Sequence, residues 1–166
     1  MYEMPESERN RLIKLRRALL LAVSDMEQAI RAAQVLVLEE DDGRLARALE
    51  TAISVTYMRP FTQGSLGQLP AEYVPNAGGG EDVHAKLKDL RDKVYAHTDE
   101  ESGRYAFVTA TARQGNTVTI DFRESWLPLP REVLPTLVMH FERQRDRFRT
   151  EAASVHVQLH GLGGLR

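Results

Sequence analysis

The stretch "LIKLRRALLLAVSDMEQAIRAAQVL", residues 12–36, repeats apolar side chains in steps of three and four residues. That spacing places them on one face of a helix with 3.6 residues per turn. The pattern predicts one long amphipathic helix from Ser7 to about Glu39, which Asp41, Asp42 and Gly43 then end. The side chains expected to face inward are Leu12, Leu15, Leu19, Ala22, Met26, Ile30, Ala33 and Leu36.

Three further amphipathic patterns predict three more helices. The second follows Gly43 and ends before Pro60, and the third runs from Glu81 or Asp82 to about Thr98. The last begins after "WLPLPREVLP", residues 126–135, and continues until the terminal "GLGGLR". The expected inward side chains are Leu45, Leu49, Ala52, Ile53 and Val55 in the second helix, Val83, Leu87, Leu90 and Val94 in the third, and Leu134, Leu137, Val138, Phe141 and Phe148 in the last.

Two other segments connect these helices. Residues 60–80 are rich in proline and glycine, which predicts a long mobile loop of the kind that serves as a lid or a binding loop. Residues 104–123 hold two alternating runs, "RYAFVTATA" and "NTVTIDF", around the turn "RQGN", which predicts a β-hairpin. The expected fold is therefore mainly α: one domain over residues 1–166, an antiparallel bundle of about four helices with a small β-hairpin between the third and the last.

Composition restricts the classes of function. The chain has no cysteine, which excludes disulfides, thiolate nucleophiles and cysteine-bound zinc. No apolar run is long enough for a membrane span and no secretory signal precedes the first helix, so we expect a cytoplasmic protein without a membrane partner. The net charge is -2, so the molecule as a whole does not attract a polyanion. We interpret two basic runs as solvated helical faces: Arg9, Arg11, Lys14, Arg16 and Arg17, and Arg143, Arg145, Arg147 and Arg149.

The stretch "LRDKVYAHTD", residues 90–99, places an arginine and a histidine six positions apart near the end of the third helix. On an ideal α-helix His97 extends the apolar stripe, whereas Arg91 lies on a neighbouring row with His84, Lys88 and Tyr95. Arg91 and His97 are then about 120° apart around the helix axis and about 9 Å apart along it. They meet only if the helix ends before His97 or if two copies of this helix face each other in a symmetric dimer.

This decapeptide resembles the signature of the HEPN superfamily, the higher eukaryotes and prokaryotes nucleotide-binding domains. The family signature has an arginine, a polar residue, a short spacer and a histidine late in a helix of a bundle. By this resemblance Arg91 is the family arginine, Asp92 the polar residue after it and His97 the family histidine. Asp99 stands where one toxin branch carries a modified tyrosine, so that form of regulation is not expected here.

The resemblance implies a homodimeric endoribonuclease of a toxin or phage-defence system that works without metal or other cofactor, on RNA or nucleotides, with an antitoxin or other partner protein. His97 would exchange protons with the ribose 2'-hydroxyl and the leaving oxygen, and Arg91 would bind the phosphate. Candidate substrate-binding residues are Tyr57 and Arg59 of "YMRPF", with Arg59 beside the third helix, and His84, Lys88 and Tyr95.

Three alternatives compete with that reading. His97 could be a hydrogen-bonded core histidine, and Arg91 and Arg59 could serve only in a salt bridge and at a helix C-terminus. The bundle could also bind a nucleotide, RNA or protein without catalysing a reaction, as the net acidity favours. The third alternative is a zinc or nickel site built from histidines, whose candidates are His84, His97, His140, His156 and His160.

Overall fold

The computed structural model describes residues 4–39, 44–64, 68–75, 80–95, 106–113, 117–124 and 129–160. Only the backbone is described for both β-strands, for residues 80–82 and 93–95, and for Arg44. Within this part of the chain, four helices pack against one another, which confirms the mainly α helical bundle. The predicted positions of His97 and Thr98 lie outside the described residues.

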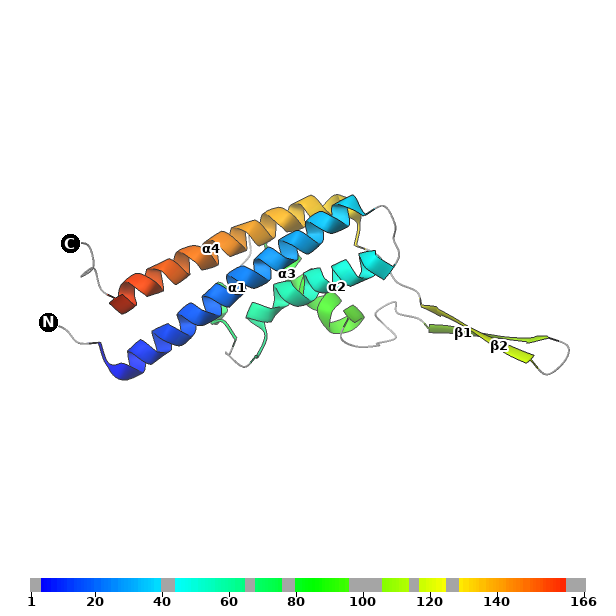
Figure 1. The fold of residues 1–166 in the computed structure, drawn as a ribbon, viewed down its shortest axis with the longest axis horizontal. Helices are drawn as coiled ribbons and strands as arrows, with labels where there is room; N and C mark the ends of the chain where they lie inside the picture. The colour runs from blue at the N-terminus through cyan, green and yellow to red at the C-terminus, as the bar shows by residue number, and fades with distance from the viewer. Residues whose placement is uncertain are drawn as a thin grey trace.

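The two longest helices, α1 (Glu6–Leu38) and α4 (Leu134–His160), form the spine of the bundle and lie side by side in opposite directions (Figure 1). The predicted inward face of α1 is buried, except that Leu15 is only partly covered. On α4 the large side chains Phe141 and Phe148 are fully buried. Burying a phenylalanine stabilises a fold by about 1.5–3 kcal/mol, so this spine provides much of the core energy.

The shorter helices α2 (Arg44–Met58) and α3 (Gly80–Asp89) pack on the spine. Ile53 of α2 and Leu87 of α3 are buried, as the sequence predicts. The prediction for Leu45 was wrong, because its side chain is 53% exposed. Leu45 is turned about 100° from Ala46 on the helix, and Ala46 begins the row that actually faces inward. The buried row of α2 is Ala46, Glu50, Ile53, Ser54 and Tyr57.

The Pro60–Gly80 segment is more structured than the sequence predicts. It begins within a 3₁₀ turn, η1 (Arg59–Phe61), and contains a second one, η2 (Ala71–Tyr73). Phe61, Leu69 and Tyr73 are all buried, and the Leu69 amide donates a hydrogen bond to the Pro60 carbonyl oxygen at 3.0 Å. These apolar side chains, spaced along the segment, anchor its described parts to the helices, so they do not form a free lid.

The third helix also differs from the prediction. We expected α-helix up to about Thr98, but α3 ends at Asp89 and the chain continues as a π-helical segment from Leu90 to Tyr95. A π-helix bonds residue i to residue i+5, so each residue turns less around the axis than in an α-helix. The α-helical geometry expected between Arg91 and the residues after it therefore does not apply.

Two antiparallel strands, β1 (Ala106–Arg113) and β2 (Thr117–Glu124), lie in the region where the sequence predicts a hairpin. Their register pairs Ala106 with Glu124 and Arg113 with Thr117. A last 3₁₀ turn, η5 (Arg131–Val133), leads into α4. Among the described residues, no helix is both long enough and apolar enough to cross a membrane.

Candidate functional site

A buried tyrosine joins three helices at the centre of the bundle. The Tyr57 hydroxyl, on α2, lies 2.9 Å from Nε2 of His140 on α4 and 3.1 Å from Nδ1 of His84 on α3. Tyr57 is fully buried and His140 is 8% exposed, whereas His84 is half-buried. Phe61 and Phe141 pack against the tyrosine ring, with centroids 5.5 Å and 5.1 Å away. We call Tyr57, His84 and His140 the histidine–tyrosine cluster.

The cluster has one hydroxyl proton for two imidazole rings. Tyr57 donates that proton to one ring nitrogen, and the other ring donates its own N–H to the hydroxyl oxygen. Burial, with lesser contributions from His84 and Arg143, lowers the pKa of His140 to about 4. Burial and then the charge of Lys88 lower the pKa of His84, and burial raises the pKa of Tyr57. All three groups are therefore neutral near pH 7, and one hydrogen-bonded chain links the core to α3.

Charged side chains gather where α3 ends and the π-helical segment begins. Asp92 accepts an ion pair from Lys88 at 3.2 Å and another from its neighbour Arg91 at 3.0 Å. The Lys88 side chain is 59% exposed and the Arg91 side chain 31% exposed. Asp92 thus holds two cations next to each other at the surface, and its carboxylate restricts where the Arg91 guanidinium can point.

The backbone conformation around these charged side chains is also unusual. Arg91 and Asp92 lie within the π-helical segment Leu90–Tyr95, a rare conformation that occurs frequently at functional sites. The packing of this segment against α2 keeps it on the bundle. The polar residues of this region are His84 and Lys88 on α3 and Arg91 and Asp92 on the π-helical segment. We call these four residues the α3 strip, and the histidine–tyrosine cluster fixes the first of them.

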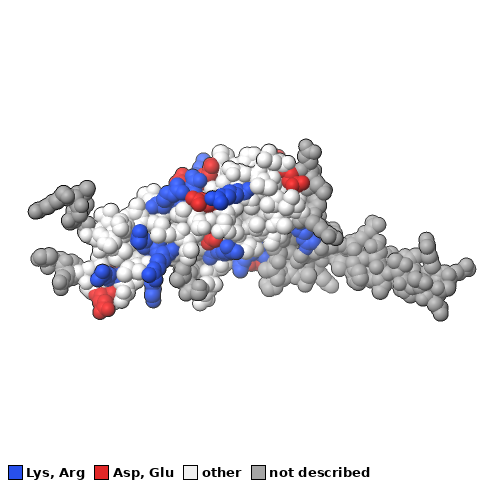
Figure 2. All heavy atoms as spheres, in the orientation of Figure 1, with Lys and Arg blue, Asp and Glu red and all other residues white. Residues whose placement is uncertain are grey.

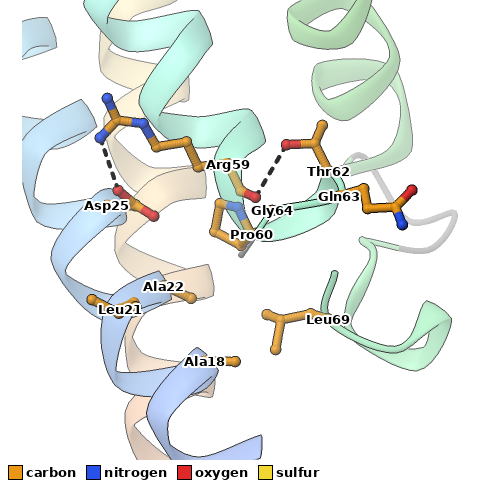
Figure 3. A pocket seen from close by; sticks show the side chains of 10 residues that line it. All are labelled: Ala18, Leu21, Ala22, Asp25, Arg59, Pro60, Thr62, Gln63, Gly64 and Leu69. Atoms are coloured by element: carbon orange, nitrogen blue, oxygen red, sulfur yellow. Dashed lines mark hydrogen bonds and ion pairs between the residues drawn. The ribbon is translucent and has the colours of Figure 1, made fainter. Parts of the chain in front are cut away.

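Of the predicted substrate-binding residues, Arg59 lies elsewhere. We expected it beside the third helix, but its guanidinium crosses to α1 and contacts Asp25 Oδ1 at 3.3 Å (Figure 3). The reason is local: Arg59 follows Tyr57 by two positions, which turns it about 200° around a helix axis, away from the side on which Tyr57 contacts α3. Tyr57, His84, Lys88, Arg91 and Asp92 are brought together, whereas His97 and the Tyr95 side chain lie outside the described part.

Two other interpretations concern a metal site, for which the candidate ligand His97 lies outside the described residues, and the two basic runs. Residues 4–39, 44–64, 68–75, 80–95 and 129–160 contain no group of three histidine, aspartate or glutamate side chains that could hold a metal ion. Basic and acidic groups are intermixed on the visible face of α1 and α4 (Figure 2). Arg145 pairs with Asp146, and Arg149 with Glu27, as expected for solvated helical faces.

Sequence reasoning missed the role of His140, which it treated only as a candidate metal ligand. A signal was present, because His140 directly precedes Phe141 and follows Leu137 by three positions, on the apolar face of the last helix. A histidine on such a face needs a buried hydrogen-bond partner. The hydrogen-bond partner of His140 depends on how α2 and α4 are rotated relative to each other, and no sequence pattern predicts this rotation.

The chain matches no protein-family model, no curated protein and no solved structure. The resemblance to HEPN proteins therefore remains a prediction that rests on residues 90–99. The candidate site rests on the contacts among α2, α3 and α4.

Proposed function

We propose that this chain is a HEPN-like endoribonuclease that needs no metal ion, acting in phage defence or in a toxin–antitoxin or stress response. The observation that carries the proposal is the Lys88–Asp92–Arg91 arrangement, in which one carboxylate holds two cations at the surface of a π-helical segment. Arg91 is the residue that the resemblance assigns to phosphate binding. A positioned guanidinium beside an ammonium is suited to bind a phosphodiester.

The chemistry follows from the side chains of the decapeptide. Arg91 binds the non-bridging phosphate oxygens and stabilises the charge that develops on phosphorus. His97 takes the proton from the 2'-hydroxyl, which then attacks the phosphorus, and an imidazolium protonates the leaving 5'-oxygen. The first step closes a 2',3'-cyclic phosphate and breaks the bond to the 5'-oxygen. One histidine serves as base and another as acid if two protomers share the cleft, so the proposal includes a homodimer.

The direct test is cleavage of RNA in EDTA by the purified wild-type protein and by Arg91→Ala and His97→Ala. General acid–base catalysis by one residue contributes about 10²- to 10⁴-fold, so we expect His97→Ala to reduce the rate by that order, and Arg91→Ala to reduce it nearly as much. Lys86→Ala, which removes another α3 cation outside the α3 strip, is the matched control and should leave the rate unchanged.

Thermal unfolding of the same proteins separates catalysis from folding. A catalytic role requires that both variants melt within a few degrees of the wild-type protein. If the wild-type protein cleaves no RNA and the variants are merely less stable, the ribonuclease proposal fails.

A noncatalytic bundle is the second candidate, and one observation favours it. The Arg91 guanidinium is already paired with Asp92 at 3.0 Å, so a phosphate must compete with a carboxylate that is covalently fixed nearby. Such a strip could bind a nucleotide, an RNA or a partner protein without cleaving it. Saturable RNA binding to a wild-type protein that leaves the RNA intact would support this candidate.

A further inference from the structure

A hollow of about 310 Å³ lies between α1 and the chain that follows α2, and none of its lining residues belongs to the α3 strip (Figure 3). One wall comes from α1 and the other from η1 and the segment after it. Its volume falls at the lower end of the range for small-molecule sites. The lining residues are Ala18, Leu21, Ala22, Asp25, Arg59, Pro60, Thr62, Gln63, Gly64 and Leu69.

The sequence explains why this hollow exists. Ala18 and Ala22 are one helical turn apart, and their short side chains leave α1 thin at this point. On the opposite side, the hydrogen bond from the Leu69 amide to the Pro60 carbonyl oxygen draws the chain back on itself and fixes the wall. Leu21 is 51% exposed at the rim, so an apolar ligand would gain contacts there that water does not provide.

Asp25 is the charged group of this hollow that lies deepest. Its side chain is 16% exposed, whereas that of its partner Arg59 is 54% exposed. The pair makes a single contact, at 3.3 Å between Arg59 Nη1 and Asp25 Oδ1. In Figure 3 the second carboxylate oxygen of Asp25 points towards the hollow, and the rest of the guanidinium points away from it.

The charge of Asp25 is incompletely compensated. Burial raises the pKa of this carboxyl group, and the hydrogen bond and charge of Arg59 oppose that rise without cancelling it. A half-buried carboxylate with one free oxygen is stabilised by a second cationic donor. Asp92 shows the same chemistry in this chain, because its carboxylate serves Lys88 and Arg91 together.

We propose that this hollow is a binding site for a small aliphatic amine. The ammonium group contacts the free oxygen of Asp25, and the hydrocarbon part packs against Ala18, Leu21 and Leu69. An aliphatic carboxylate is disfavoured because Asp25, which lies deeper in the hollow than Arg59, repels it. An aliphatic alcohol binds more weakly than the amine because its hydrogen bond to Asp25 lacks the charge. This site gives two residues of the "YMRPF" motif a role apart from the proposed ribonuclease activity, because Arg59 and Pro60 form one wall of the hollow. Arg59 also limits the affinity for the amine, since its guanidinium competes with the ammonium group for Asp25.

Three probes that share one carbon skeleton test the site: 3-methylbutylamine, 3-methylbutan-1-ol and 3-methylbutanoate. Binding is followed at pH 7 by the NMR shifts of the leucine methyl groups. For a ligand of this size we expect the amine to saturate with a Kd on the order of 1 mM and to shift the methyl signals of Leu21 and Leu69. The alcohol should bind at least about tenfold more weakly, and the acid should not bind.

Variants identify the contacting group. Asp25→Asn should reduce the affinity for the amine to that for the alcohol. Glu27→Gln is the matched control, because Glu27 lies on the same helix and pairs with Arg149 outside the hollow, and it should change nothing. Arg59→Ala should tighten amine binding several-fold, since it removes the competing cation.

Each contrary result overturns the proposal. The hollow does not recognise an ammonium group if the amine and the alcohol bind with equal affinity, or if the amine shows no saturable binding. The same conclusion follows if Asp25→Asn leaves amine binding unchanged. If the Asp25→Asn variant does not fold, the Arg59→Ala variant alone tests the proposal. Amine binding by Arg59→Ala that is equal to or weaker than that of the wild-type protein then rejects the site.

Discussion

The Tyr57 hydroxyl lies 2.9 Å from Nε2 of His140, a contact that joins α2 to α4 across 83 residues of sequence. His84 completes the arrangement from α3 at 3.1 Å. Three helices thus meet at one oxygen atom that has no access to water. Since α3 also carries Lys88, which pairs with Asp92 and through it with Arg91 of the π-helical segment, the polar centre of the core and the candidate site belong to one connected structure.

Stability should fall in mild acid because of His140. Its pKa is about 4 in the folded protein against 6.5 normally, so the unfolded chain binds more protons between these values. Stability is therefore full above about pH 6.5 and declines as the pH falls towards 4, by about 3 kcal/mol from this residue. The lowered pKa of His84 acts in the same direction. Urea unfolding from pH 7.5 to 4.5 measures the slope.

His140→Gln is the control for this pH dependence, because glutamine keeps a hydrogen-bonding group but does not titrate. Its stability should change less between pH 6.5 and pH 4.5 than that of the wild-type protein. An equal slope in both proteins would assign the acid sensitivity to other groups.

Removal of the Tyr57 hydroxyl should destabilise the bundle without creating a cavity. Tyr57→Phe leaves ring nitrogens of His84 and His140 without their partner, at a cost of about 1–3 kcal/mol. For a chain of this length the melting temperature should drop by roughly 2–12 °C. Tyr73→Phe is the matched change, since Tyr73 is also buried but makes no hydroxyl hydrogen bond within the described part of the chain. A similar drop in both variants would contradict the role of the cluster.

The attachment of α3 to the bundle depends on few apolar contacts, so one truncation should be severe. Leu87 is 1% exposed and is the one fully buried apolar side chain among the described residues of α3. Leu87→Ala should cost about 2–5 kcal/mol. Leu45→Ala makes the same chemical change at a 53% exposed site and should stay within about 0.5 kcal/mol of the wild-type protein. Chemical denaturation of both variants checks this difference.

If RNA binds along the α3 strip, Lys88 should contribute one phosphate contact. Lys88→Ala should then weaken binding at low salt and reduce the slope of log K against log salt concentration by about 0.7, the value for one contact to single-stranded nucleic acid. Lys86→Ala should leave the slope unchanged, because Lys86 lies on a different face of α3. Identical slopes in all three proteins would place the RNA elsewhere.

The oligomeric state provides a test that needs no substrate. A HEPN-like homodimer should have twice the monomer mass of 18.8 kDa in light scattering at micromolar concentration. A species of 18.8 kDa under these conditions would remove the second histidine that the proposed acid–base mechanism requires.

The helices could be predicted from sequence because their period is local information. The steps of three and four in α1 and α4 are repeated many times, so single errors such as Leu45 in α2 do not obscure the pattern. The π-helical segment could not be predicted, since Leu90–Tyr95 carries no glycine, proline or other marker of a changed hydrogen-bond pattern. The spacing in this segment fits an α-helix equally well.

The candidate site was only partly predictable for a related reason. The sequence places His84, Lys88 and Arg91 in one α-helical row, but α3 ends at Asp89, so the fixed geometry of a single α-helix covers only His84 and Lys88. The partners on other helices depend on rotation and packing, so neither the Tyr57–His140 contact nor the Asp25–Arg59 pair could be deduced. Arg59 was misplaced because its partner, Asp25, comes from α1 rather than from α3.

Glu50 is a carboxylate on α2 that is only 1% exposed, and it accepts a hydrogen bond from the Leu129 amide at 2.9 Å. The π-helical segment that ends at Tyr95 also packs on α2. One helix therefore secures the chain on both sides of residues 96–128. Because the free-energy cost of closing a loop rises by only about 0.6 kcal/mol for each doubling of its length, a longer or shorter connection after the decapeptide should change the stability of the bundle little. The two anchors on α2 set where this connection begins and ends, whatever its length.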